Sequence, residues 1–157
     1  MRNNKGFSMV ELIIVIAVMA ILAGAIAPTL IKYVSKSRMS ADIKNANEIA
    51  NCTQIALAES EIADYVFSQT MPYSVYTDAL DSTDIFEAFI LEHMSASIPC
   101  KYRKNGAEKF QITIYPNDAG TGFAVEVTAT ANGMTAKTAG IKGTGYLLFP
   151  NVDPSYE

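Results

Sequence analysis

The feature that most constrains this 157-residue chain is an uncharged run from Leu12 to Ile31, whose apolar character is interrupted only by Gly24, Pro28 and Thr29. Twenty residues rise about 30 Å as an α-helix, which is enough to cross the hydrocarbon core of a bilayer. The run is too long and too uniformly apolar for the buried core helix of a soluble protein. It therefore predicts a membrane-spanning segment or a secretory signal.

A cleaved signal peptide and a plain membrane anchor are the ordinary interpretations. Arg2 and Lys5 precede the run, and Ala25-Ile26-Ala27 has the small-residue pattern of a signal cleavage site. However, the run is slightly long for such a signal, and Pro28 would directly follow the cut. A plain anchor explains the length but not Glu11, because a charge at mid-bilayer costs roughly 2.5–3.5 kcal/mol on insertion scales, and less near the interface.

The residues around Glu11 resemble a known signature. A short basic leader ends at Gly6, an aromatic residue follows at Phe7, and three variable residues lead to Glu11 and the apolar run. This pattern resembles the prepilin signature of type IV pilins and their pseudopilin relatives. It covers roughly the first 30 residues and departs only mildly, with Ser8-Met9 where Thr-Leu is common.

The resemblance implies that a prepilin peptidase cuts between Gly6 and Phe7 on the cytoplasmic side and that Phe7 becomes a methylated N-terminus. Losing Arg2 and Lys5 lowers Lys plus Arg from 12 to 10 against 16 acidic residues, a formal net charge of −6. Two buried opposite charges that pair offset the cost that each has alone. As the resemblance implies, we therefore expect Glu11 to meet the Phe7 ammonium of a neighbouring helix and to guide each subunit into a growing filament.

The chain is expected to have four parts: a leader peptide over 1–6, a transmembrane or filament-core helix over 7–31, an amphipathic continuation of that helix over 32–66, and a globular domain over 67–157. Apolar residues recur at steps of three and four from Met39 to Leu57, which predicts the amphipathic part. No proline interrupts the chain between Pro28 and Pro72, so the sequence predicts an unbroken helix to about Tyr65.

Gly24 and Pro28 mark an expected soft point in this helix. Proline has no N–H, so the carbonyl of Gly24 loses its helical partner, and glycine itself is a weak helix former. A simple kink, common in membrane helices, is the plain interpretation. The resemblance adds another, in which part of the segment becomes extended in an assembled filament.

The sequence of the globular part predicts an α+β arrangement, with a small antiparallel sheet of three or four strands on the second half of the long helix. The resemblance implies that this arrangement is a pilin fold. Asp81–Leu91 predicts a short helix with a polar cap at its start. Alternation and turn residues predict strands over 110–115, 123–129, 135–139 and 146–149, with tight turns at 117–122 and 132–133 and an extra pairing segment at 101–103.

Neither a cofactor nor enzymatic chemistry is expected. Cys52 and Cys100 lie 48 positions apart and form no CxxC pair, so the spacing gives no metal site, and either a reduced pair or one disulfide is open. No nucleophile elbow and no phosphate-binding loop occurs. The net charge of −4 argues against nucleic acid as the main ligand.

Charge is sorted along the chain. No Lys or Arg lies between Asn45 and Cys100, whereas Lys101, Arg103, Lys104 and Lys109 cluster just beyond. The plain interpretation is two solvated faces, and the sharper one is lateral attraction between an acidic and a basic face of neighbouring subunits.

The sequence thus predicts a prepilin held in the cytoplasmic membrane and then assembled into a type IV pilus-like extracellular filament, of the kind used for motility or adhesion. Its expected partners are itself, other pilins, the prepilin peptidase, the assembly platform and the cytoplasmic membrane. One alternative is a pseudopilin of a type II secretion or competence (DNA-uptake) system. A more remote one is a signal-anchored or secreted binding protein, for which the mature chain would start at Pro28 instead of Phe7.

Overall fold

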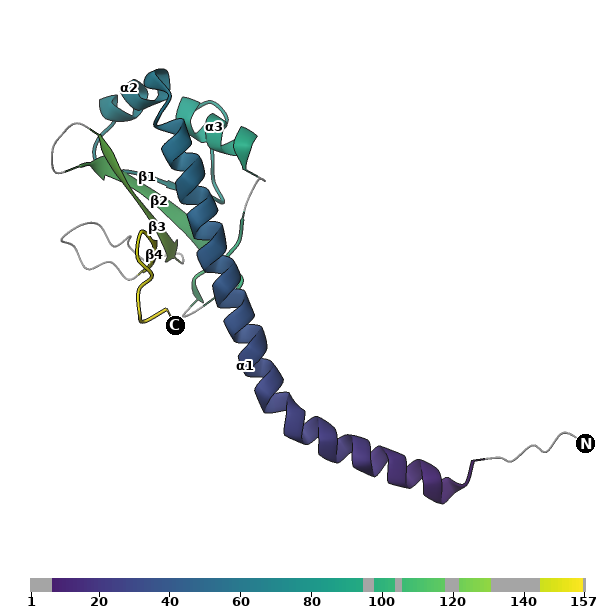
Figure 1. Cartoon of the computed structure of the whole chain (residues 1–157). Coiled ribbons are helices and arrows are strands. Elements are labelled where there is room, and N and C mark those ends of the chain that lie inside the picture. Colours follow the sequence, from purple (N-terminus) through teal and green to yellow (C-terminus); the bar gives the residue numbers. More distant parts are fainter. Residues whose placement is uncertain (1–6, 95–97, 104–105, 118–121, 131–144, 157) are drawn as a thin grey trace, which may run out of the picture. The chain divides into compact units, whose positions relative to one another are not determined.

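The computed structural model describes residues 7–94, 98–103, 106–117, 122–130 and 145–156. The chain divides into two compact units, Met1–Ser37 and Arg38–Glu157, and helix α1 belongs to both. The elements in chain order are α1 (Met9–Ala56), α2 (Ser60–Ser68), β1 (Tyr73–Tyr76), α3 (Ile85–His93), β2 (Lys109–Pro116), β3 (Phe123–Thr130) and β4 (Tyr146–Phe149) (Figure 1).

The described part of the first unit is an exposed apolar helix. Every residue from Phe7 to Val34 is exposed, and α1 continues through Pro28. This surface is large and contiguous, which marks a segment made for lipid or for other protein surfaces rather than for water.

The second unit is built on a four-stranded sheet in the order β1-β2-β3-β4, with every neighbouring pair antiparallel. Alternate residues of β2 and β3 point to one face, where Ile112 pairs with Val127 and Ile114 with Val125. These side chains form one core with Ile49 and other buried residues of α1. The predicted α+β architecture, a long helix packed on a small antiparallel sheet, is confirmed.

A buried carboxylate ties distant parts of the second unit to α1. Asp42 is fully buried, and its two oxygens accept the backbone N–H groups of Lys101 and Tyr102, each at 2.7 Å, and the hydroxyl of Tyr156 at 2.8 Å. Tyr102 and Tyr156 also meet edge to face, with ring centroids 5.4 Å apart. One side chain of α1 therefore holds both the segment after Cys100 and the C-terminal turn.

The predicted unbroken helix to about Tyr65 is wrong. Helix α1 ends at Ala56, Glu59 is extended (φ −75°, ψ 120°), and α2 starts at Ser60. At about 100° per residue, a continuous helix would place Ile62 about 160° from Ala46, outside the core face, and Asp64 directly on it. The break lets Ile62 and Val66 become buried instead.

The predictions for the sheet are confirmed in part. Strands β2, β3 and β4 and helix α3 lie where the patterns placed them. Residues 101–103 are not a strand, and the backbone N–H groups of Lys101 and Tyr102 bind Asp42 rather than a neighbouring strand. Strand β1 was not predicted, since Tyr73–Tyr76 is too short to show alternation. The predicted strand at 135–139 and turn at 132–133 fall outside the described residues.

Candidate assembly site at the start of helix α1

Glu11 is hydrogen-bonded to its own helix terminus. Helix α1 begins at Met9, and Oε2 of Glu11 accepts the backbone N–H of Ser8 at 2.9 Å. The next turn closes with the Leu12 N–H donating to the Ser8 carbonyl at 3.2 Å. Ser8-Met9-Val10-Glu11 has the S-x-x-E spacing of a capping box, in which the carboxylate satisfies a helix-end donor that would otherwise lack a partner.

The cap gives Glu11 a hydrogen bond but no cation, and the apolar segment around it supplies none. No Lys or Arg occurs from Phe7 through Ile31. The positive end of the helix dipole favours a carboxylate in the first turn, but only by a fraction of the cost of a buried charge. A carboxylate in this apolar setting is therefore stabilised most by pairing with a cation from outside the segment.

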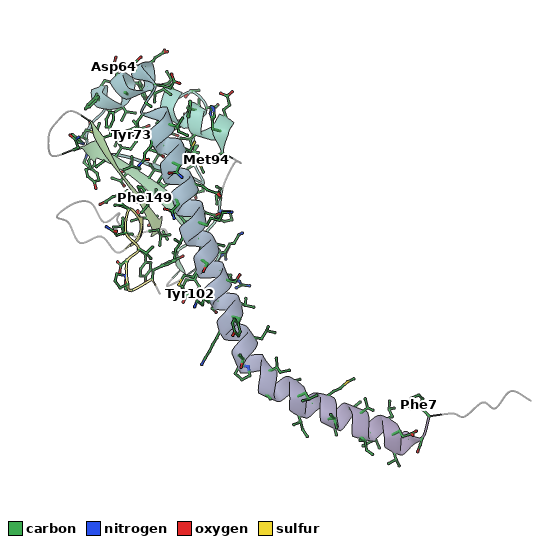
Figure 2. The ribbon with its side chains drawn as sticks, viewed as in Figure 1. Phe7, Asp64, Tyr73, Met94, Tyr102 and Phe149 are labelled. Atoms are coloured by element: carbon green, nitrogen blue, oxygen red, sulfur yellow. The ribbon has the colours of Figure 1, made fainter. Side chains whose placement is uncertain are left out.

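Phe7 lies immediately before the helix and is 87% exposed. Figure 2 labels it at the start of α1. Phe7 directly precedes Ser8, whose backbone nitrogen Glu11 binds, and the Cα atoms of consecutive residues lie about 3.8 Å apart. Gly6, the other half of the predicted cleavage site, falls outside the described residues.

Helix α1 is long and apolar enough to cross a membrane, and no residue of its apolar window is buried. Within the described residues, the apolar run is therefore not a buried core helix.

Comparison with known families matches one segment of the chain. Residues 1–27 match the model of the prokaryotic N-terminal methylation motif. The N-terminal segment carries a prepilin signature. This signature is shared by type IV pilins and pseudopilins, and together with the apolar helix it supports membrane anchoring. Curated proteins and solved structures give no match.

Within the prepilin segment, Gly24 and Pro28 both lie inside α1. A Cβ added at Gly24 would meet nothing within 4 Å, so glycine is not required there by packing within this chain. The absence of a side chain instead leaves room for a close approach by another helix. The role of these residues as a soft point stays a prediction.

The two cysteines are free thiols, Cys52 partly exposed on α1 and Cys100 buried. Cys100 adjoins Lys101, whose N–H binds Asp42. Cys52 lies ten residues beyond Asp42 on the same helix, about 15 Å farther along it. Burial raises the pKa of both thiols, so both are protonated at neutral pH and are poor nucleophiles.

The other titratable clusters of the described residues have structural partners. Tyr65 donates to Asp84 at 2.6 Å, and Tyr73 donates to the same oxygen at 3.1 Å and to Glu87 at 3.4 Å, which joins α2, β1 and α3. The ring of His93 stacks on Phe89 at 4.0 Å. In the described part of the chain, no three or more His, Cys, Asp or Glu side chains gather as metal ligands.

Sequence reasoning proposed Phe7 and Glu11, whose roles stay predictions, but missed Ser8 and Asp42. The signal for Ser8 was available, since S-x-x-E before an apolar run is a capping-box pattern. No local signal marks Asp42, whose partners lie 59, 60 and 114 positions away.

Proposed function

We propose that this chain is a structural pilin subunit of a type IV pilus-like extracellular filament, made as a membrane-anchored prepilin. A prepilin peptidase cuts after Gly6, Phe7 becomes the methylated N-terminus, and the subunit assembles through α1. The observation that carries the proposal is Glu11, the lone charged residue from Phe7 through Ile31, whose side chain accepts a backbone N–H rather than pairing with a cation.

The cap gives Glu11 a role before assembly. While the subunit waits in the membrane, the Ser8 N–H satisfies one carboxylate oxygen at the helix end, near the interface where a charge costs least. Cleavage then creates an ammonium at Phe7 in the same apolar setting. Both charges are best satisfied when the Phe7 amine of one subunit meets Glu11 of the next. A subunit that is added with the wrong axial offset leaves both charges without a partner.

The first experiment is to sequence the N-terminus of the protein recovered from the cell surface. A start at methylated Phe7 supports processing as a pilin, and a start at Pro28 would identify a cleaved signal peptide. Imaging sheared surface material with an antibody to this chain separates a long surface filament from a short pseudopilus of a secretion or competence system, which would use the same N-terminal chemistry.

The role of Glu11 is tested with Glu11→Gln. Glutamine is the other residue that closes a capping box, so this variant keeps the Ser8 bond but removes the charge. We expect it to insert in the membrane normally and to lose filaments, because a pair of charges in an apolar medium is replaced by one uncompensated ammonium.

Glu48→Gln is the matched control for this variant. Glu48 is an exposed carboxylate of the same helix, 3.6 Å from Lys44 and outside the apolar run, so filaments should form normally. Normal filament yield from Glu11→Gln would show that Glu11 acts only as a helix cap, and would contradict the charge-pairing role.

A further inference from the structure

Helices α2 and α3 contact each other and enclose an open groove of about 310 Å³. Its floor is apolar, and three carboxylates stand around it. The apolar residues are Ile62, Ile85, Ala88 and Phe89, and the carboxylates are Glu59, Glu61 and Glu92. All three glutamates are exposed, and none makes an ion pair with another described residue.

The sequence around the groove offers it no cation, because Lys and Arg are absent between Asn45 and Cys100. An apolar floor within an acidic rim is complementary to an apolar or aromatic side chain flanked by cations. The question is which basic surface fits it.

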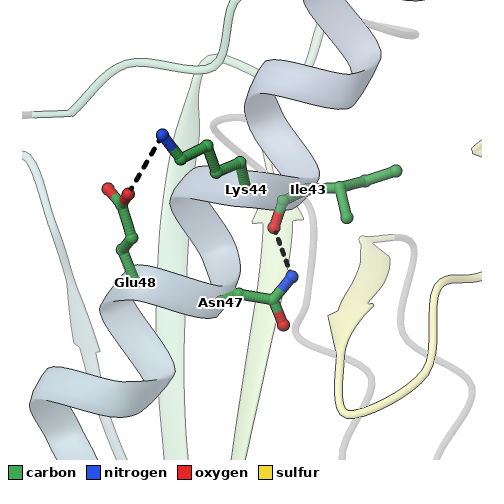
Figure 3. Close-up of polar contacts among 4 residues, drawn as sticks. All are labelled: Ile43, Lys44, Asn47 and Glu48. Carbon is green, nitrogen blue, oxygen red and sulfur yellow. Dashed lines mark hydrogen bonds and ion pairs between the residues drawn. The ribbon is translucent and has the colours of Figure 1, made fainter.

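Several cations of the second unit already have an acidic partner. Lys44 lies 3.6 Å from Glu48 on the same helix (Figure 3), Arg103 lies 3.8 Å from Glu108, and Lys109 lies 3.5 Å from Asp78. Figure 3 also shows Asn47 donating to the Ile43 carbonyl, a bond of 2.9 Å. The polar side chains of this part of α1 are therefore already engaged with neighbours one turn away on the same helix.

Lys32 and Lys36 have no such partner among the described residues, and no acidic residue lies between Glu11 and Asp42. On a helix of 3.6 residues per turn, Lys32, Tyr33 and Lys36 share one face of roughly 100°. Tyr33 is 70% exposed. Arg38 lies roughly 200° around the helix from Lys36, on another face.

We propose that the groove between α2 and α3 receives the Lys32–Lys36 face of α1 from a second copy of this chain. The ring of Tyr33 covers the apolar floor, and the ammonium groups of Lys32 and Lys36 meet the rim carboxylates. Lys101 is also exposed, but its neighbour Tyr102 is partly buried against Tyr156, so that surface offers no free aromatic ring. The inference rests on the proposed function, because it supplies a lateral contact between subunits of one polymer.

The contact is tested by photo-cross-linking in the assembled polymer of the full chain. A photoreactive phenylalanine analogue replaces Tyr33, and the polymer is grown from mixed ¹⁴N- and ¹⁵N-labelled subunits. The expected product joins position 33 of one isotope to peptides containing Ile62 or Ile85–Phe89 of the other. Cross-links to lipid only, to the groove of the same isotope only, or to another surface would overturn the inference.

Charge reversal provides the second arm. Lys36→Glu should lower polymer yield about fivefold, the change expected when an exposed ion pair becomes a repulsion at each contact. Glu92→Lys in the same chain should restore most of the yield, and a cation in the last turn of α3 suits the helix dipole. Arg38→Glu, the same charge change on another face, is the control and should leave the yield unchanged.

The outcomes separate the inference from the proposed function. A wild-type chain that never polymerises overturns both. A wild-type polymer without the cross-link, or equal losses from Lys36→Glu and Arg38→Glu, overturns the groove contact and leaves the filament proposal standing.

Discussion

Asp42 and Glu11 are two carboxylates of one helix that have opposite surroundings. Asp42 is fully buried with three donors, and Glu11 is exposed with one. Charge-assisted hydrogen bonds to a buried carboxylate are strong, and losing the carboxylate leaves its donors unsatisfied in a low-dielectric interior. The same functional group therefore stabilises the fold in one place and remains available to a partner in the other.

The stability role of Asp42 is measurable by denaturant unfolding of the full chain in mild detergent. We expect Asp42→Ala to lower the free energy of unfolding by about 3 kcal/mol, because two backbone N–H groups and the Tyr156 hydroxyl lose their acceptor. Tyr156→Phe should cost about 1 kcal/mol, since it removes one of the three bonds. Glu48→Ala, an exposed change on the same helix, should cost far less. Equal costs for Asp42→Ala and Glu48→Ala would contradict this account.

Tyr156, which is buried, and Tyr73, which is partly buried, are expected to make stability fall at high pH. Burial raises the pKa of Tyr156 and of Tyr73, and hydrogen bonds and charge from Asp42 and Asp84 raise them further. An unfolded tyrosine has a pKa of about 10, so this stabilisation is fully present below pH 10 and is lost as pH rises above it. We expect Tyr156→Phe to reduce the loss in unfolding midpoint above about pH 10, whereas Tyr33→Phe, an exposed change, should not. If the unfolding midpoint of Tyr156→Phe fell with pH as steeply as that of the wild-type chain, Tyr156 would not be a cause of the loss in stability.

Among the helices and strands, local sequence patterns correctly predicted those that local interactions determine. Strands β2 and β3 follow alternation, and α3 begins at a polar cap as expected. The break between α1 and α2 has no glycine or proline to mark it. Its cause is the change in phase that buries Ile62 and Val66, which becomes visible only when the position of the core is known. Phe7 and Glu11 could be proposed as site residues from the sequence because their spacing is local, and their roles stay predictions, whereas the partners of Asp42 lie in segments distant in sequence.

The start of α3 depends on one side chain. Oδ1 of Asp84 accepts the N–H groups of Phe86 and Glu87 at 2.9 and 3.0 Å, while Oδ2 accepts the hydroxyls of Tyr65 and Tyr73. Asp84→Ala should therefore cost about 2 kcal/mol, the upper range for an N-cap, because it also releases two phenols.

Asp84→Asn separates the two contributions, because asparagine is an equally good N-cap but is uncharged. We expect it to cost less than Asp84→Ala in the same unfolding assay. Asp81→Ala is the control, because exposed Asp81 accepts only the local N–H of Thr83 through its side chain among the described bonds. A cost for Asp81→Ala as large as that for Asp84→Ala would refute the assignment.

For the whole molecule, the described core lies entirely within the second unit. Every buried residue that the structure describes falls within the range from Asp42 to Tyr156, while Phe7 to Val34 buries none. A unit that contains its own core and polar contacts is expected to fold alone. Under the proposed function, the first unit would then serve membrane anchoring and contacts between subunits rather than the stability of the globular fold.

A fragment starting at Arg38 should therefore be soluble without detergent and should unfold cooperatively, with a thermal midpoint close to that of the full chain in detergent. Starting the fragment at Asn47 instead removes Asp42 and Ala46, and should cost at least about 3 kcal/mol, because the segment after Cys100 and the C-terminal turn lose their common acceptor. Both fragments lack the apolar run, so solubility alone cannot explain a difference between them. If the fragment from Arg38 were unfolded, or no more stable than the one from Asn47, the globular unit would depend on contacts with the apolar helix, and Asp42 would not be the residue that ties its distant segments together.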